Sequence, residues 1–187
     1  MLVIMEKSWL GKLLSRTPKT SPVSETTGVD CTDANAQFSQ GVKCASGTGA
    51  AQDYVQAADW YRKAAAQNHG LAQFNLGTMY AHGQGVARDE AQSQLWFGRA
   101  ANLGDAGGQY HMGKSCQRAS LDGLPADSTE ARIEAYKWFE LSAAQGYKNS
   151  EGAYAPLTFK MTRADVAEAI RRVAKFSVVP LLKPLPL

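Results

Sequence analysis

The sequence predicts an all-α fold, a right-handed α-solenoid of about three 36-residue helix-turn-helix repeats with a C-terminal capping helix. A Trp-aromatic pair, separated by two residues from a pair of small residues, begins at Trp60, Trp96 and Trp138, with spacings of 36 and 42 residues. A second match precedes each pair: the segments AQFSQG, AQFNLG and GQYHMG begin at residues 36, 72 and 108. A period of this length indicates stacked units, none of which can bury its apolar face alone.

The middle repeat, residues 71–104, shows how one unit is expected to be built. Its first helix contains Gly77, which recurs as Gly41 and Gly113. Because glycine inside a helix costs about 1 kcal/mol against alanine, its recurrence indicates close approach of the partner helix. The second helix is expected to bury four residues, Ala91, Leu95, Trp96 and Ala100.

Helix ends can also be predicted from the repeat. A Gly83-Gln84-Gly85 turn breaks the first helix, and Asp89, matched by Asp53, is placed to cap the second. Gly104 is expected to adopt the left-handed C-cap conformation, which Asn68 tolerates at the equivalent position.

The third repeat is longer than the other two. Four extra residues between Asp127 and Trp138 add about one helical turn, so we expect a longer second helix capped by Ser128 or Thr129. An insertion on one face of a repeat array is often the part that is specific to one protein.

Charge is distributed unevenly over a chain whose net charge is +3. Residues 1–28 carry four Lys or Arg against two acids, and residues 160–187 carry six against two, whereas the body between them carries ten against thirteen. A mildly acidic body argues against nucleic acid as a partner, because a nucleic-acid site needs a basic face.

The first 28 residues contain an apolar run of five residues, too short for a signal peptide. Residues 5–15 have two interpretations, an amphipathic membrane-surface helix or a disordered leader. The Ser/Thr/Pro-rich stretch that follows them favours the disordered leader. No apolar stretch approaches the ~20 residues that span a bilayer. The predicted location is cytoplasmic.

Two cysteines, Cys44 and Cys116, occupy one repeat position two units apart. Ordinary helix spacing places them about 20 Å from each other, beyond the reach of a disulfide. We therefore expect free thiols, which suit a reducing compartment. Cys31 precedes the first repeat.

The sequence contains few candidates for a catalytic or metal-binding site. Its three histidines, His69, His82 and His111, show no metal-ligand spacing, and no nucleophile stands in a catalytic motif. We predict no enzymatic activity, no cofactor and no metal.

These motifs resemble the Sel-one-like repeats of the tetratricopeptide superfamily. The shared features are A-x-x-x-L-G-x-x-Y, a G-x-G loop and W-[YF]-x-x-A-A-x-x-G, over about residues 34–147. Residues 161–169 resemble the helix that commonly follows the last unit, with Thr162 as its N-cap. The residues expected to face the last repeat are Val166, Ile170, Val173 and Phe176.

The resemblance implies a division of the chain and a function. The expected segments are a flexible basic leader at 1–30, the repeat array at 31–148, capping helices at 149–177 and a Pro-rich tail at 178–187. The implied function is that of a non-catalytic adaptor that binds a protein or peptide. The alternative is a membrane-associated or envelope scaffold anchored by the N-terminal segment.

In related arrays the first helix of each unit lines the concave groove. If this holds here, the partner-binding residues are Ser39, Val42, Lys43, Asn75, Thr78, Met79, His111, Lys114 and Ser115. Asn75 is placed to hold a peptide backbone, and an exposed Met79 would suit adaptable recognition. Helix faces in solvent also carry Ser, Asn, Thr and Lys, so a plain solvated surface is the competing interpretation.

Overall fold

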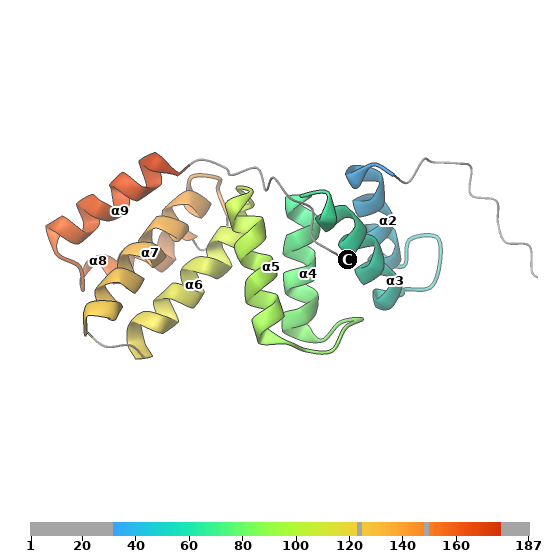
Figure 1. Ribbon diagram of the computed structural model, residues 1–187, viewed down its shortest axis with the longest axis horizontal. Coiled ribbons are helices and arrows are strands. Elements are labelled where there is room, and N and C mark those ends of the chain that lie inside the picture. Colours follow the sequence, from blue (N-terminus) through green and yellow to red (C-terminus); the bar gives the residue numbers. More distant parts are fainter. Residues whose placement is uncertain (1–31, 123–124, 148–149, 177–187) are drawn as a thin grey trace, which may run out of the picture.

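A computed structural model describes residues 32–122, 125–147 and 150–176, which form helices and no strand. The helices are α2 (Ala34–Ser46), α3 (Tyr54–Ala66), α4 (Gly70–His82), α5 (Glu90–Asn102), α6 (Ala106–Asp122), α7 (Pro125–Ala143), α8 (Ser150–Thr158) and α9 (Arg163–Lys175). They follow one another along the long axis of the molecule (Figure 1) and pack mainly on their neighbours in the chain. The predicted all-α solenoid of three helix pairs is confirmed. The expected leader and tail, and the amphipathic segment at 5–15, lie outside the described residues.

The helix caps predicted for the first two units are confirmed. The carboxylates of Asp53 and Asp89 each accept a hydrogen bond from the backbone amide three residues ahead, at 2.9 and 3.0 Å. Asn68 adopts a left-handed φ of 62°, and Gly104 one of 88°. These caps satisfy backbone groups that a helix leaves unpaired at its ends.

Each first helix approaches its partner closely at the recurrent glycine. A Cβ atom added to Gly77 would lie 2.7 Å from the ring of Phe97 on the next helix. The same contact joins Gly41 to Tyr61 and Gly113 to Phe139. The period therefore fixes where the two helices of a unit touch.

The expected burial of α5 is partly wrong. Ala91 and Leu95 are exposed, and Trp96 is half-buried, whereas Ala100 is buried as expected. The buried stripe runs instead through Ser93, Phe97, Ala100 and Ala101. The reason is the close approach at Gly77: the Ser93 hydroxyl fits there and donates to the Gly77 carbonyl at 2.8 Å.

Buried glutamines join neighbouring units. Gln73 and Gln109 each donate through Nε2 to a carbonyl of the preceding unit, at Ala65 and Ala101, over 3.1 and 3.4 Å. Within the third unit, Gln145 donates to the Oε1 atom of Gln109 at 2.9 Å. The equivalent Gln67 makes the same bond to Gln37, also at 2.9 Å. These contacts repeat with the period and were not predicted.

The middle unit lacks that donor, because Leu103 stands where Gln67 and Gln145 stand in the other units. The Oε1 atom of Gln73 is buried and has no hydrogen-bond partner among the described residues. We expect Leu103→Gln to raise the free energy of unfolding by about 1 kcal/mol, because it supplies the missing donor. Urea melts would measure this gain. The control is Leu103→Glu, because glutamate has nearly the shape of glutamine but lacks its amide N–H donor. Equal stability of Leu103→Gln and Leu103→Glu would contradict the account.

The third unit departs from the other two in both helices. α6 and α7 have 17 and 19 residues, whereas the helices of the first two units have 13. The longer second helix is therefore confirmed. Capping by Ser128 or Thr129 is wrong, because α7 already begins at Pro125 and both residues lie inside it. Proline suits the first position of a helix, where its missing N–H is not needed.

The last helix, α9, covers α7. Thr162 caps it in a capping box with Asp165, as expected for the cap. Phe176 lies with its ring 5.6 Å from that of Trp138, and Val166 and Val173 are half-buried, whereas the expected burial of Ile170 is wrong. Ala169 is buried in its place, since a small residue lets α9 approach α7 closely.

Arg172 adds a polar contact between α9 and α7. Its guanidinium binds Glu134 at 2.7 Å and Glu130 on α7, and Glu168 on its own helix at 2.9 Å. Lys137 also donates to Glu134, at 2.6 Å. Burial acts to raise the pKa of Glu134, but the hydrogen bonds and charges of Lys137 and Arg172 together outweigh it and lower that pKa.

Cys44 and Cys116 are both free thiols, as the repeat register predicts. The Cys44 thiol donates to the Gln56 Oε1 atom at 2.9 Å. Burial raises the pKa of both thiols, which keeps them protonated and poorly reactive. Cys31 lies outside the described residues.

Candidate functional site

The three predicted contact residues of the first unit lie on the surface of α2. Ser39, Val42 and Lys43 are exposed, and the side chain of Val42 is 41% exposed. The Ser39 hydroxyl donates to the backbone oxygen of Asn35 in its own helix at 2.8 Å. This part of the surface therefore offers an apolar side chain beside a lysine.

In the middle unit the predicted surface is more closed. Asn75 and Thr78 are half-buried, and the Asn75 side chain hydrogen-bonds the hydroxyl of Tyr61. Burial raises the pKa of Tyr61, and this hydrogen bond opposes the rise. The Thr78 hydroxyl donates to the Phe74 carbonyl at 3.2 Å. Asn75 is thus already engaged with the preceding unit.

The expected exposure of Met79 is wrong. Its side chain is 4% exposed and belongs to the core cluster formed by α3 and α4. Val86, from the turn after α4, packs on the same cluster. Met79 is buried because it fills the space between the two helices and this turn.

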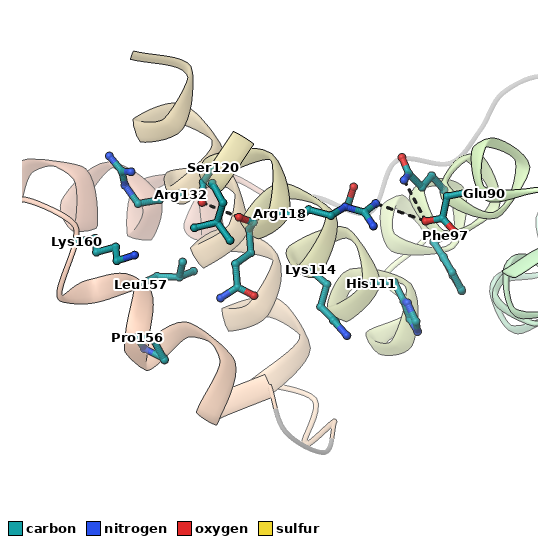
Figure 2. Close-up of a pocket in the computed structure, with 14 residues that line it drawn as sticks. Glu90, Phe97, His111, Lys114, Arg118, Ser120, Arg132, Pro156, Leu157 and Lys160 are labelled. Carbon is teal, nitrogen blue, oxygen red and sulfur yellow. Dashed lines mark hydrogen bonds and ion pairs between the residues drawn. The ribbon is translucent and has the colours of Figure 1, made fainter. Parts of the chain in front are cut away.

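The third unit opens into a groove of about 570 Å³. The wall of the groove on α6 includes His111, Lys114 and Ser115. These are all the partner-binding residues predicted for the third unit. Figure 2 shows the labelled side chains of α6 between those of α5 and α8. The other lining residues are Glu90, Gln94, Phe97, Gln117, Arg118, Ser120, Leu121, Arg132, Pro156, Leu157 and Lys160.

Positive charge dominates the groove. Four of the described lining residues are cationic, and one, Glu90, is anionic. Glu90 lies 3.5 Å from Arg118 and also accepts a hydrogen bond from Gln94 at 3.3 Å, as Figure 2 shows. The groove therefore retains an excess of positive charge.

His111 is packed as a ring rather than presented as a charge. It stacks on Phe97 with the ring centroids 4.0 Å apart and the planes 9° from parallel. Burial lowers its pKa, and the charges of Lys114 and His82 lower it further, whereas Glu90 raises it. At neutral pH His111 is therefore a neutral stacking residue in the groove wall.

Part of this site could not be found from the repeat alone. Arg118 continues the spacing of His111, Lys114 and Ser115 along α6, and that helical spacing was an available signal. Arg132 on α7 and Lys160 after α8 reach the groove only through tertiary packing. No local pattern in the sequence marks them as neighbours of α6.

Signs of metal chemistry or a membrane span are absent from the part of the chain that the structure describes. Within residues 32–122, 125–147 and 150–176, no group of three or more His, Cys, Asp or Glu side chains is placed to hold a metal ion. No helix in the same ranges is long and apolar enough to cross a membrane.

Paired helices stacked at a fixed period define the chain as a helical repeat protein of the tetratricopeptide-like superfamily. A sequence model of the Sel1 repeat family matches residues 36–69, 70–105 and 106–147, which correspond to the three helix pairs. The chain belongs to the Sel1 repeat family. Repeats of this family generally serve as protein–protein interaction modules.

Solved structures of two other repeat proteins are among those similar to this chain. The Sel1 repeat protein from Oxalobacter formigenes is 35% identical with a TM-score of 0.55, and the match covers 67% of this chain and 90% of that one. The second is c5321, a protective antigen present in uropathogenic Escherichia coli strains displaying an SLR fold. It is 25% identical with a TM-score of 0.45, and the match covers 74% of this chain and 38% of that one. No curated protein matches the chain.

Proposed function

We propose that this chain is a non-catalytic adaptor that binds a peptide or protein partner along the face formed by α2, α4 and α6. The general role of Sel1 repeats supports the interaction function. The observation that carries the choice of face is the groove of the third unit, whose wall contains the predicted contact residues His111, Lys114 and Ser115 of α6.

The framework positions keep the same chemistry in all three units. They are the close-contact glycines Gly41, Gly77 and Gly113, and the buried glutamines Gln37, Gln73 and Gln109. The predicted contact positions on the same helices differ from unit to unit. They are Ser39, Asn75 and His111 at one position, and Val42, Thr78 and Lys114 at the next.

Packing between units explains the repeated framework, and it leaves the contact positions free to differ and so to recognise a partner. The face also ends in a groove lined by both apolar and charged side chains, the combination that suits a peptide. Met79 is not part of the proposed contact set, because it is buried.

Two exposed valines of the first unit test the choice of face. Val42 lies on α2 and is 41% exposed, and Val55 lies on α3 and is 61% exposed. Proteins captured from cells by the full chain would be purified and titrated against Val42→Glu and Val55→Glu. We expect Val42→Glu to weaken binding roughly tenfold, or about 1.4 kcal/mol, because it places a charge in the interface. Val55→Glu should stay within about twofold of the native chain.

Both valines are exposed, so both variants should keep the native melting temperature, and circular dichroism would verify this. The proposal fails if Val55→Glu abolishes binding while Val42→Glu leaves it intact, because the partner would then lie on the second helices.

A further inference from the structure

Among the described residues, the groove lies where the third unit has a smaller side chain than the second. In the second unit, Met79 packs into the cluster between α3 and α4. Ser115 stands at the repeat position of Met79 and is much smaller. α4 ends at His82, whereas α6 continues past the equivalent Arg118 to Asp122. The groove therefore lies beside α6, which is longer than α4.

Three cationic side chains of this groove have no carboxylate partner among the described residues. No ion pair among the described residues includes Lys114, Arg132 or Lys160. Arg132 donates to the Thr129 hydroxyl at 2.8 Å, while its Nε atom is buried without a hydrogen-bond partner in the described ranges. Three positive side chains thus share one groove without a carboxylate of their own.

The same groove has an apolar component. Phe97 and Leu157 are buried beneath it, and Leu121 is largely exposed at its edge. A small inorganic anion would satisfy the cations but leave this apolar surface in water. An extended peptide carrying both acidic and apolar side chains would satisfy both.

We propose that the groove between α5, α6 and α8 binds an acidic segment of a protein partner, one in which carboxylates alternate with apolar side chains. Lys114, Arg132 and Lys160 bind the carboxylates, and Leu121 and Leu157 contact the apolar side chains. This inference rests on the proposed function. It adds the chemistry of the partner and the part of the proposed face that binds it.

A protein partner is favoured over nucleic acid by the surroundings of the groove. Residues 29–159 carry thirteen acids against ten Lys or Arg, so the cations form a local cluster. Nucleic-acid sites need a basic stripe that follows several phosphates.

Selection from a random peptide library displayed on phage, with the full chain as bait, tests this inference. The expected result is enrichment of Asp and Glu, interspersed with apolar residues, relative to the unselected library. The selected peptides should bind at least tenfold more weakly to a Lys114→Glu, Lys160→Glu double variant, and raising the salt concentration should weaken their binding to the native chain. Replacing their Asp and Glu by Asn and Gln should cause a similar loss.

The matched control is a Lys63→Glu, Lys175→Glu double variant, which changes the net charge equally at exposed sites away from the groove. It should retain native affinity. Selected peptides without acidic enrichment, or an equal loss in both double variants, would overturn the inference. It would also be overturned if a single-stranded oligonucleotide bound the groove more tightly than the selected peptides.

The outcomes also separate this inference from the proposed function. Non-acidic peptides whose binding is lost in Val42→Glu would overturn the inference and leave the proposed face intact. A full chain that selects no peptide at all would count against both.

Discussion

Phe139→Ala is expected to lower the free energy of unfolding by about 3–5 kcal/mol, the usual cost of removing a buried phenylalanine. Phe139 is 0% exposed and is the largest fully buried side chain among the described residues. Its ring lies against Gly113 and 5.7 Å from the ring of Tyr110, and it clusters with Leu157 of α8. The substitution therefore leaves a cavity where α6, α7 and α8 meet. Urea melts monitored by circular dichroism would measure the loss.

Phe159→Ala is the matched control. Phe159 follows α8 and is 91% exposed, so its removal should change stability by no more than about 0.5 kcal/mol. If the two alanine variants lost similar stability, the packing assigned to the third unit would be wrong.

Gly77→Val is expected to destabilise the chain by about 1–3 kcal/mol through overpacking. The first added carbon would already lie 2.7 Å from the Phe97 ring, and valine adds two methyl groups beyond it. The Phe97 ring is held in turn by His111, which stacks on it with the ring centroids 4.0 Å apart. Because neighbouring units stabilise each other, damage in the middle unit should weaken both sides of the array. The measurement is again the urea midpoint.

Gly98→Ala separates overpacking from the intrinsic effect of losing a helical glycine. A Cβ at Gly98 meets only the Met112 Sδ atom, at an ordinary 3.6 Å. This change should therefore stabilise the chain, by up to about 1 kcal/mol. A stable Gly77→Val variant would show that α4 and α5 do not approach as closely as described.

The helix pairs and their ends were predictable because the repeat shows each signal more than once. A glycine inside a helix is ambiguous by itself, but Gly41, Gly77 and Gly113 recur opposite an aromatic ring. The caps at Asp53 and Asp89 likewise satisfy backbone groups by local bonds, which depend on neighbours in the sequence alone.

Side-chain burial was less predictable, because in a stacked array each helix packs on neighbours at two sides. Leu95 is apolar yet exposed, and Met79 is buried where an exposed side chain was expected. Gln73 is polar yet buried, because its amide bonds the preceding unit across the interface. Hydrophobicity alone cannot identify which face meets which neighbour.

The candidate site was predictable in part, for the same reason. His111, Lys114 and Ser115 share one face of α6 at helical spacing, so their place in one wall follows from the sequence. Arg132 and Lys160 complete the groove from other helices. Their contribution depends on how α7 and α8 pack on α6, which the three-unit period does not specify.

Site-specific photo-crosslinking tests the proposed recognition face most directly. A photo-reactive phenylalanine analogue would replace, one at a time, Val42 and Lys114 on the first helices, and Val55 and Leu95 on the second helices, all of which are exposed. With a partner protein bound to the full chain, we expect crosslinks from positions 42 and 114 and none from positions 55 and 95. Crosslinks from positions 55 and 95 alone would contradict the account, because the partner would then lie on the opposite helices of each pair.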